Sequence, residues 1–243
     1  EHSWLRAMGV DVAVEPNSSI LADITACENA VSQESPDTEA KLAAVRTLRE
    51  RLITGGTAAD PLVATHGWEK VAWTIKHMTV NWAVVSGLTV SQRAEIEDWC
   101  KSINTTLASL STPNEDMLKR ARENTAGAIM NIVRSSSEVA ARFVDEIKAF
   151  AADESPGVRS EIASRIRYLW NADITLLWDL AEGFAKTETN ARVLVQFLNF
   201  LIRASKDEPD RIDALTQTIL QRGNIEKSEG RDIFHECIGT LVF

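Results

Sequence analysis

The chain has 243 residues, of which 44% are hydrophobic and 25% are charged, and its formal net charge at pH 7 is −9. This composition is typical of a globular protein and excludes an intrinsically disordered chain, which would contain fewer apolar residues. Three cysteines are too few for a disulfide framework, so we expect reduced, buried thiols and a cytoplasmic protein. The acidic charge argues against a general nucleic-acid binder and against a membrane partner, and no apolar run has the length of a transmembrane helix. Because the sequence begins at Glu1 rather than at a methionine and ends on apolar residues, we expect a fragment of a larger protein.

Helical periodicity dominates the sequence. Apolar residues recur at spacings of three and four, and prolines stand where helices should begin. The pattern predicts an all-α fold with about ten to twelve helices, short loops and no convincing strand. The expected spans are 17–32, 36–54, 66–86, 90–110, 113–134, 136–151, 156–170, 172–186, 189–205, 209–222 and 228–242.

Several helix starts carry recognisable capping signals. Ser35 and Ser155 each precede a proline, which is the expected order of an N-cap and a first helical residue. Thr112 and Glu115 have the spacing of a capping box, and Thr89 opens the predicted helix 90–110.

The first half, residues 1–135, is predicted to be an irregular helical bundle around one central helix. The segment 66–86 is apolar on nearly all sides, which is typical of a buried helix. We therefore expect Trp73 and Trp82 to be core residues.

The second half, residues 136–243, has shorter helices that come in pairs. The predicted pairs are 136–151 with 156–170, 172–186 with 189–205, and 209–222 with 228–242. Helix pairs that recur at about 35 residues are the sequence pattern of an α-solenoid, although the repeats share little residue identity.

Two resemblances go with this pattern. The run Asp153-Glu154-Ser155-Pro156-Gly157-Val158-Arg159, followed by Ile162, Ala163 and Leu169, resembles the turn and second helix of a HEAT repeat. The match covers roughly residues 138–171 and implies that the N-terminal bundle continues into a HEAT-like α-solenoid over 136–243. The order of Leu176-Leu177-Trp178, Val193-Leu194, Phe197-Leu198 and Pro209 is similar to the C-terminal helical region of large bacterial signal-transduction ATPases. That resemblance implies partner sensing, and no ATPase activity follows from it because the sequence has no P-loop.

No residue pattern points to a catalytic, cofactor or metal site. His66 and His77 would lie about 16 Å apart on one helix, too far for one metal ion. Asp232, His235 and Cys237 cluster near the end of the chain, where a polar helix edge is the simpler interpretation. Cys100 is expected to be an inert buried thiol.

Arginine clusters are the remaining candidates for a site. They comprise Arg46, Arg49 and Arg51; Lys119, Arg120 and Arg122; and Arg159, Arg165 and Arg167. Such clusters usually form a solvated helix face with i,i+4 ion pairs, and the alternative is a local basic groove. The predicted partner-binding residues are Arg159, Arg165, Arg167 and Arg192.

Three functions are therefore compared. The first, which we favour, is a non-catalytic scaffold or sensor region that binds a protein partner. The second is an all-α enzyme or small-ligand-binding domain on the Trp68–Trp82 helix, with His66 or His77 as acid or base. The third is a nucleic-acid-binding HEAT-like domain, which the net charge disfavours.

Arg159 gives the sharpest expectation of the sequence. If 153–159 is a HEAT-like turn, its guanidinium should bond carbonyl groups or an acidic side chain of the adjacent repeat. Arg159→Ala should then destabilise the fold by about 1–3 kcal/mol, against roughly 0–0.5 kcal/mol for Arg122→Ala, with Arg122 taken as exposed.

Overall fold

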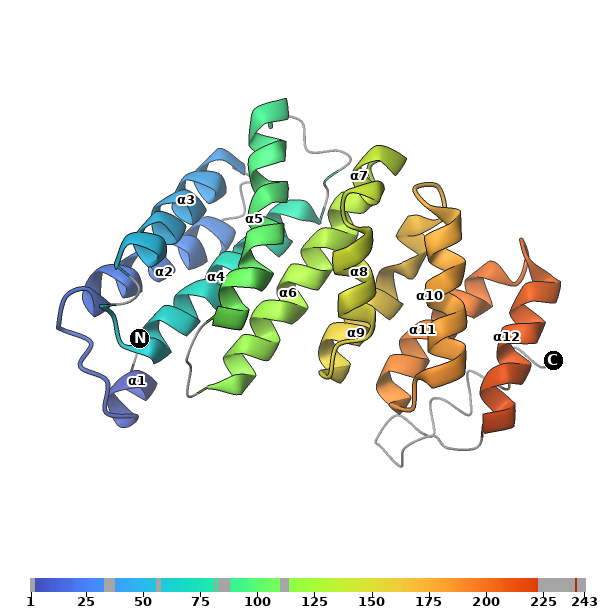
Figure 1. Cartoon of the computed structure of the whole chain (residues 1–243). Helices are drawn as coiled ribbons and strands as arrows, with labels where there is room; N and C mark the ends of the chain where they lie inside the picture. The colour runs from blue at the N-terminus through green and yellow to red at the C-terminus, as the bar shows by residue number, and fades with distance from the viewer. Residues whose placement is uncertain are drawn as a thin grey trace. The chain divides into compact units, whose positions relative to one another are not determined.

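The computed structural model describes residues 3–32, 38–55, 58–80, 82, 88–109, 114–222 and 239. Within these ranges the regular structure consists of twelve α-helices and one 3-10 helix, without a strand (Figure 1). The all-α prediction is therefore confirmed. The chain divides into two compact units, Glu1–Ile129 and Met130–Phe243. No helix in the described ranges has the combined length and apolar character that crossing a membrane requires.

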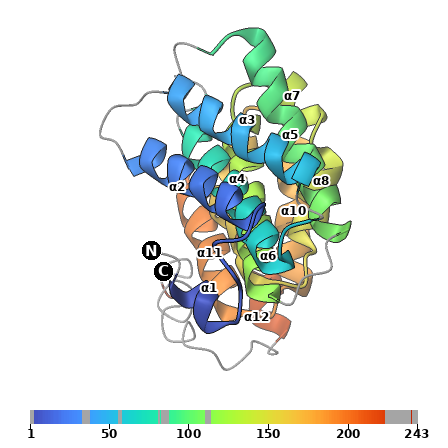
Figure 2. The same cartoon turned by 90° about the vertical axis from the view of Figure 1, so that its left-hand side faces the viewer.

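The first unit contains the N-terminal helices. They are α1 (Ser3–Ala7), α2 (Asn17–Ser32), α3 (Thr38–Gly55), α4 (Pro61–Thr79), α5 (Val90–Ser109) and the larger part of α6 (Glu115–Val133). Helices α2, α3 and α4 pack against one another in all three combinations, and α5 packs on α4 (Figure 2). The short α1 was not predicted from the sequence, and residues 12–14 after it form a turn and a bend.

Helix α4 is the buried helix that the sequence predicts, with different ends. It begins at Pro61 rather than at His66, because the Asp60 carboxylate accepts a hydrogen bond from the Leu62 N–H at 2.9 Å and so caps the helix. It ends at Thr79. Trp82 is a core residue, as expected, with 2% of its surface exposed. The expectation for Trp73 is wrong, because its side chain is only half-buried and lies against the His77 ring and the Lys70 ammonium group.

Gly67 sets how closely α4 approaches the other helices of the first unit. A Cβ atom at this position would lie 2.8 Å from Cδ2 of Leu52 on α3 and 3.3 Å from Cγ2 of Ile20 on α2. Both distances are shorter than ordinary van der Waals contact. The missing side chain therefore lets the three helices meet here.

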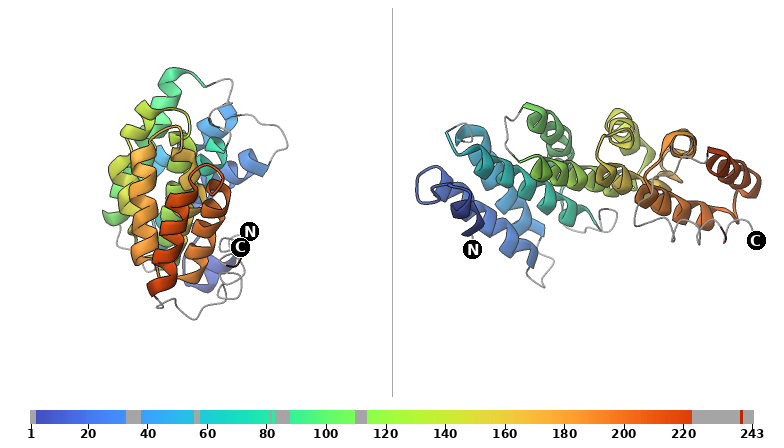
Figure 3. Two further views of the ribbon diagram at one scale, coloured as in Figure 1. Left: turned by 90° about the vertical axis from the view of Figure 1, so that its right-hand side faces the viewer. Right: turned by 90° about the horizontal axis from the view of Figure 1, so that it is seen from below.

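The second unit continues with shorter helices. They are α7 (Ser137–Ala141), α8 (Val144–Ala151), α9 (Pro156–Arg165), the 3-10 helix η1 (Ile166–Leu169), α10 (Ile174–Thr187), α11 (Ala191–Ala204) and α12 (Pro209–Arg222). Helix α9 packs on α11, α10 packs on α12, and α8 contacts both α9 and α10. Figure 3 shows α10, α11 and α12 beside one another at the end of the described chain.

Two predicted helices of this unit are each divided. The segment 136–151 breaks at Arg142 and Phe143, where neither glycine nor proline marks the interruption. The segment 156–170 changes to a 3-10 turn at Ile166. Residues three apart are eclipsed in a 3-10 helix, so Ile166 and Leu169 both become fully buried.

Helix starts agree with the capping signals only in part. Ser155 and Pro156 stand at the start of α9 as predicted, although the Ser155 hydroxyl makes no capping bond. Helix α5 follows Thr89, whose hydroxyl accepts from the Gln92 N–H. Helix α6 is capped by Asn114 through the Met117 N–H. The predicted signals at Ser35 and Thr112, and the predicted helix 228–242, lie outside the described residues.

Candidate binding site

The second unit contains a hollow of about 390 Å³ where three arginine side chains gather. We call it the arginine hollow, and it is lined by Arg134, Arg167, Tyr168, Trp170, Asn171, Phe200, Arg203, Ala204 and Asp207. Arg134 directly follows α6. Four lining side chains come from η1 and the two residues after it, and the other four come from the end of α11 and the loop that follows it.

Local helix geometry explains how these segments meet. On α11, Phe200, Arg203 and Ala204 have the i, i+3, i+4 spacing that puts side chains on one helix face. Trp170 lies 6.4 Å from Phe200, measured between ring centroids. Trp178 contacts both rings from α10, at 5.7 Å and 6.1 Å. The rings of Tyr168, Trp170 and Phe200, which we call the aromatic floor, therefore line the hollow together with three arginine side chains.

The charge of the arginine hollow is not neutralised by its own lining. The guanidinium of Arg134 lies over the Tyr168 ring at 5.1 Å. In the described part of the chain, Arg134, Arg167 and Arg203 form no ion pair with a carboxylate. Asp207 is the one acidic residue among the lining side chains. A positive site thus exists locally on a chain whose net charge is −9.

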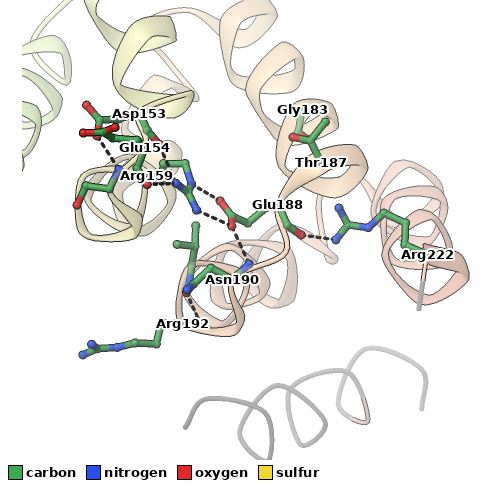
Figure 4. A network of polar contacts seen from close by, with 11 residues as sticks. Asp153, Glu154, Arg159, Gly183, Thr187, Glu188, Asn190, Arg192 and Arg222 are labelled. Carbon is green, nitrogen blue, oxygen red and sulfur yellow. Dashed lines mark hydrogen bonds and ion pairs between the residues drawn. The ribbon is translucent and has the colours of Figure 1, made fainter. Parts of the chain in front are cut away.

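Arg159 has a different environment, a buried ion pair with Glu188 (Figure 4). Its Nε donates to Glu188 Oε2 at 2.6 Å, and its Nη2 donates to Oε1 at 3.0 Å. Its Nη1 donates to the carbonyl oxygens of Asp153 and Glu154 at 2.7 Å and 3.0 Å. The bonds that the sequence predicts, to carbonyls and to an acidic side chain of the next helix pair, are therefore confirmed.

Glu188 connects this ion pair to two further elements. Its Oε1 accepts from the Asn190 N–H at 2.8 Å, next to the start of α11. Its backbone oxygen accepts from Arg222 Nη2 at the end of α12. Arg159 and Glu188 also line a second hollow of about 440 Å³. Because only 18% and 2% of their side-chain surfaces are exposed, their charges serve each other rather than a ligand.

The four predicted partner-binding residues do not lie in one place. Arg159 is committed to Glu188, and Arg165 pairs with Glu161 on the same helix at 2.6 Å. Arg192 is exposed, and Figure 4 shows its side chain directed away from the Arg159–Glu188 pair. Arg167 is the predicted residue that lines the arginine hollow.

Sequence reasoning missed Arg134 and Arg203, the other two arginines of the hollow. Each is a single cation near the end of a helix, where positive charges are common because they complement the helix dipole. No local pattern distinguishes them from ordinary surface arginines. Their meeting depends on how α6, η1 and α11 pack.

The arginines of the cluster on α3 contact residues of other helices. They do not form the solvated helix face with i,i+4 ion pairs that is usual for such clusters. Arg46 makes two hydrogen bonds to Glu95 of α5, at 2.9 Å and 2.6 Å, and Arg51 bonds Asp23 of α2. Arg49 lies over the Trp99 ring, 5.7 Å from its centroid.

The cluster on α6 is mixed. Lys119 lies within 3.8 Å of Glu115, four residues earlier, as an i,i+4 pair. Arg120 instead reaches Glu69 of α4. Arg122 is half-buried with interaction partners, so its assignment as an exposed arginine was wrong.

Among the described histidines and cysteines, His66, Cys27 and Cys100 are buried, whereas His77 is exposed. His66 is buried between the Trp4 ring and Glu69, whose Oε2 lies 3.2 Å from Nδ1. His77 lies against the Trp73 ring at 4.6 Å. Burial raises the pKa of the Cys27 thiol to about 11 and also raises that of Cys100. The Asp232, His235 and Cys237 cluster lies outside the described residues, and within them no group of acidic, histidine and cysteine side chains could hold a metal ion.

Comparison with known proteins adds no relative. No family model, no curated protein and no solved structure matches the chain.

Proposed function

We propose that the chain is a non-catalytic helical scaffold that binds a protein partner, and that its second unit is a short HEAT-like solenoid with the partner at the arginine hollow. The observation that carries this proposal is the arginine hollow itself. Three guanidinium groups without carboxylate partners in the described chain surround an aromatic floor. Arginine and aromatic side chains are the residues most enriched where proteins bind one another.

The packing of the second unit supports the solenoid. In the described part of this unit, α8 packs on α10, α9 packs on α11 and α10 packs on α12, so the pair α8–α9 contacts the pair α10–α11, which in turn contacts α12. Contacts of each repeat with its neighbour are the defining property of repeat proteins. Such a stack presents a continuous rigid surface, which is how helical repeats bind extended partners.

Buried polar bonds between the pairs add to this support. Glu188, at the turn between α10 and α11, holds Arg159 of the preceding pair and Arg222 of the following helix. The resemblance to the C-terminal helical region of bacterial signal-transduction ATPases favours the same function, since those regions sense or bind partners. The enzyme alternative has no comparable observation in its favour among the described residues, and the net charge of −9 disfavours the nucleic-acid alternative.

Site-specific photo-crosslinking tests the proposed function in cells that naturally make the protein. Asn171 is exposed and lines the arginine hollow, so a photoreactive amino acid at this position should trap the partner. We expect a discrete cross-linked protein that disappears when Arg203→Glu is added and persists when Arg192→Glu is added. Absence of any cross-linked protein, or equal loss with both substitutions, would contradict the proposal. Cross-linked nucleic acid would favour the third function.

A further inference from the structure

We propose that the arginine hollow receives an acidic peptide segment of the partner, with at least two carboxylates next to an apolar side chain. This inference rests on the proposed function and specifies the chemistry of the partner at that same site.

The positive charge of the arginine hollow is best complemented by a ligand with more than one negative group. The chain has 35 acidic and 26 basic residues, so carboxylates are abundant, and other arginines are paired with them. The arginine hollow instead gathers three guanidinium groups with Asp207 alone. Each guanidinium presents a planar fork of donors that fits a carboxylate with two parallel bonds. A ligand with two or more carboxylates therefore complements this site.

The aromatic floor of the hollow is best complemented by an apolar group of the ligand, next to the ligand's negative groups. Phe200 is almost fully buried, whereas Tyr168 and Trp170 are half-buried and keep ring surface at the hollow. Arg134 is already held over Tyr168 by a cation–π contact, which orients its guanidinium before a ligand arrives. An apolar side chain of the ligand would cover the remaining surface of Trp170.

The acceptors in the lining favour a peptide over a phosphate group. The Asp207 carboxylate and the Asn171 carbonyl oxygen can accept hydrogen bonds, and the backbone N–H groups of a peptide would supply the donors. A phosphate ester at neutral pH brings mostly acceptors and supplies no comparable set of N–H donors to Asp207. A nucleic acid would also extend its phosphates beyond the hollow over a chain of net charge −9. A hollow of about 390 Å³ matches a few side chains of one short segment.

The test uses a fluorescein-labelled peptide of sequence Glu-Glu-Leu-Asp-Glu-Phe and the whole protein. Fluorescence anisotropy would measure its dissociation constant at about 50 mM salt and again at about 150 mM salt. A matched peptide has Gln and Asn in place of Glu and Asp. The variants are Arg167→Ala with Arg203→Ala, and Arg192→Ala as a control with the same change of charge per residue. Arg192 is on α11 like Arg203, but about 16 Å along the helix axis.

We expect the acidic peptide to bind, the neutral peptide to bind at least about tenfold more weakly, and higher salt to weaken binding. The double substitution should raise the dissociation constant by about twentyfold, and Arg192→Ala by less than about twofold. The substituted side chains of Arg167, Arg192 and Arg203 are exposed, so the substitutions should not disturb folding, and the melting temperature of each variant should confirm this.

Three results would overturn the inference. The first is that the acidic peptide does not bind at concentrations up to about 1 mM. The second is that Arg192→Ala weakens binding of the peptide as much as the double substitution does. The third is that inorganic phosphate or a short single-stranded oligonucleotide binds more tightly than the peptide. A partner cross-linked at Asn171 together with any of these results would leave the proposed function standing and remove the acidic segment alone.

Discussion

At the residue scale, the burial of Glu188 makes Arg159 a sensitive position. Only 2% of the Glu188 side chain is exposed, and Arg159 provides its countercharge through two hydrogen bonds. Arg159→Ala would leave a buried carboxylate without that charge. We therefore expect a loss of about 3 kcal/mol in the free energy of unfolding, measured from urea denaturation midpoints.

Two further variants separate the ion pair from the size of the side chain. Arg192→Ala removes an exposed arginine and should change stability by less than about 0.5 kcal/mol. Arg159→Lys keeps the charge but not the planar fork, so its loss should lie between the other two. Equal midpoints for Arg159→Ala and Arg192→Ala would show that the buried pair contributes nothing.

The two described cysteines lead to a prediction about reactivity. Burial raises the pKa of Cys27 to about 11, so its thiol is protonated at pH 8 and lacks the reactive thiolate. Cys100 is buried with 1% exposure, and its pKa is raised too. Iodoacetamide should modify neither residue in the native protein at about pH 8, and both after unfolding in urea. Peptide mass spectrometry distinguishes them from Cys237, and rapid native labelling of Cys27 would refute its buried placement.

At the element scale, Gly67 determines how α4 crosses α3 and α2. Alanine at this position gains about 1 kcal/mol of helix propensity, but its Cβ would meet Leu52 Cδ2 at 2.8 Å. Overpacking of this kind costs about 1–3 kcal/mol, so Gly67→Ala should destabilise the fold by about 0–2 kcal/mol. Urea denaturation gives the value.

The same substitution should change sign when space is made for it. Leu52→Ala removes the two closest atoms, Leu52 Cδ2 and Cδ1, leaves Ile20 Cγ2 at 3.3 Å, and by itself costs about 2–5 kcal/mol. In that background Gly67→Ala should stabilise the protein by up to about 1 kcal/mol, the helix-propensity gain less any cost of the remaining contact with Ile20. The four stabilities form a double-mutant cycle, and additivity of the two single effects would mean that these helices do not meet at Gly67.

The elements also show what periodicity can and cannot predict. Most predicted helices are present because an apolar stripe that must be buried specifies a helix face whatever its neighbours are. The predicted helix boundaries were wrong for two different reasons. The Asp60 cap moves the start of α4 to Pro61, and nothing in the local sequence marks the break at Arg142. The misjudged Trp73 lies on the side of α4 where Lys70 and His77 cover its ring.

At the scale of the whole molecule, the candidate site was less predictable than the fold. Arg159 was identified because the residues that determine its bonds, from Asp153 onward, are neighbours in sequence. Arg134, Arg167 and Arg203 come from three separate segments, and only tertiary packing brings them to one hollow. A sequence pattern reports local geometry, so it can indicate a turn but not a site assembled from distant helices.

The net charge and the ion pairs together determine how stability responds to acid. Hydrogen bonds and charge from Arg46 lower the pKa of Glu95 below its usual value. Burial alone would raise the pKa of Glu69, but the bond with His66 and the charges of Lys70 and Arg120 lower it overall. A carboxylate whose pKa is lower in the folded than in the unfolded chain stabilises the fold above its unfolded pKa, and this contribution is lost as the pH falls.

We therefore expect the unfolding free energy to change in two stages on acidification. Mild acid first relieves the repulsion among the surplus of carboxylates on a chain of charge −9, so stability should hold or rise slightly. Below about pH 4.5 the protonation of Glu95 and Glu69 removes their ion pairs, and stability should fall steeply. Urea denaturation between about pH 7 and about pH 3 measures both stages. The Glu95→Gln variant should have a lower unfolding free energy at neutral pH than the unmodified protein. Its unfolding free energy should fall less below about pH 4.5, because this carboxylate no longer titrates. Parallel curves for the two proteins would show that the Arg46–Glu95 pair does not contribute to acid sensitivity.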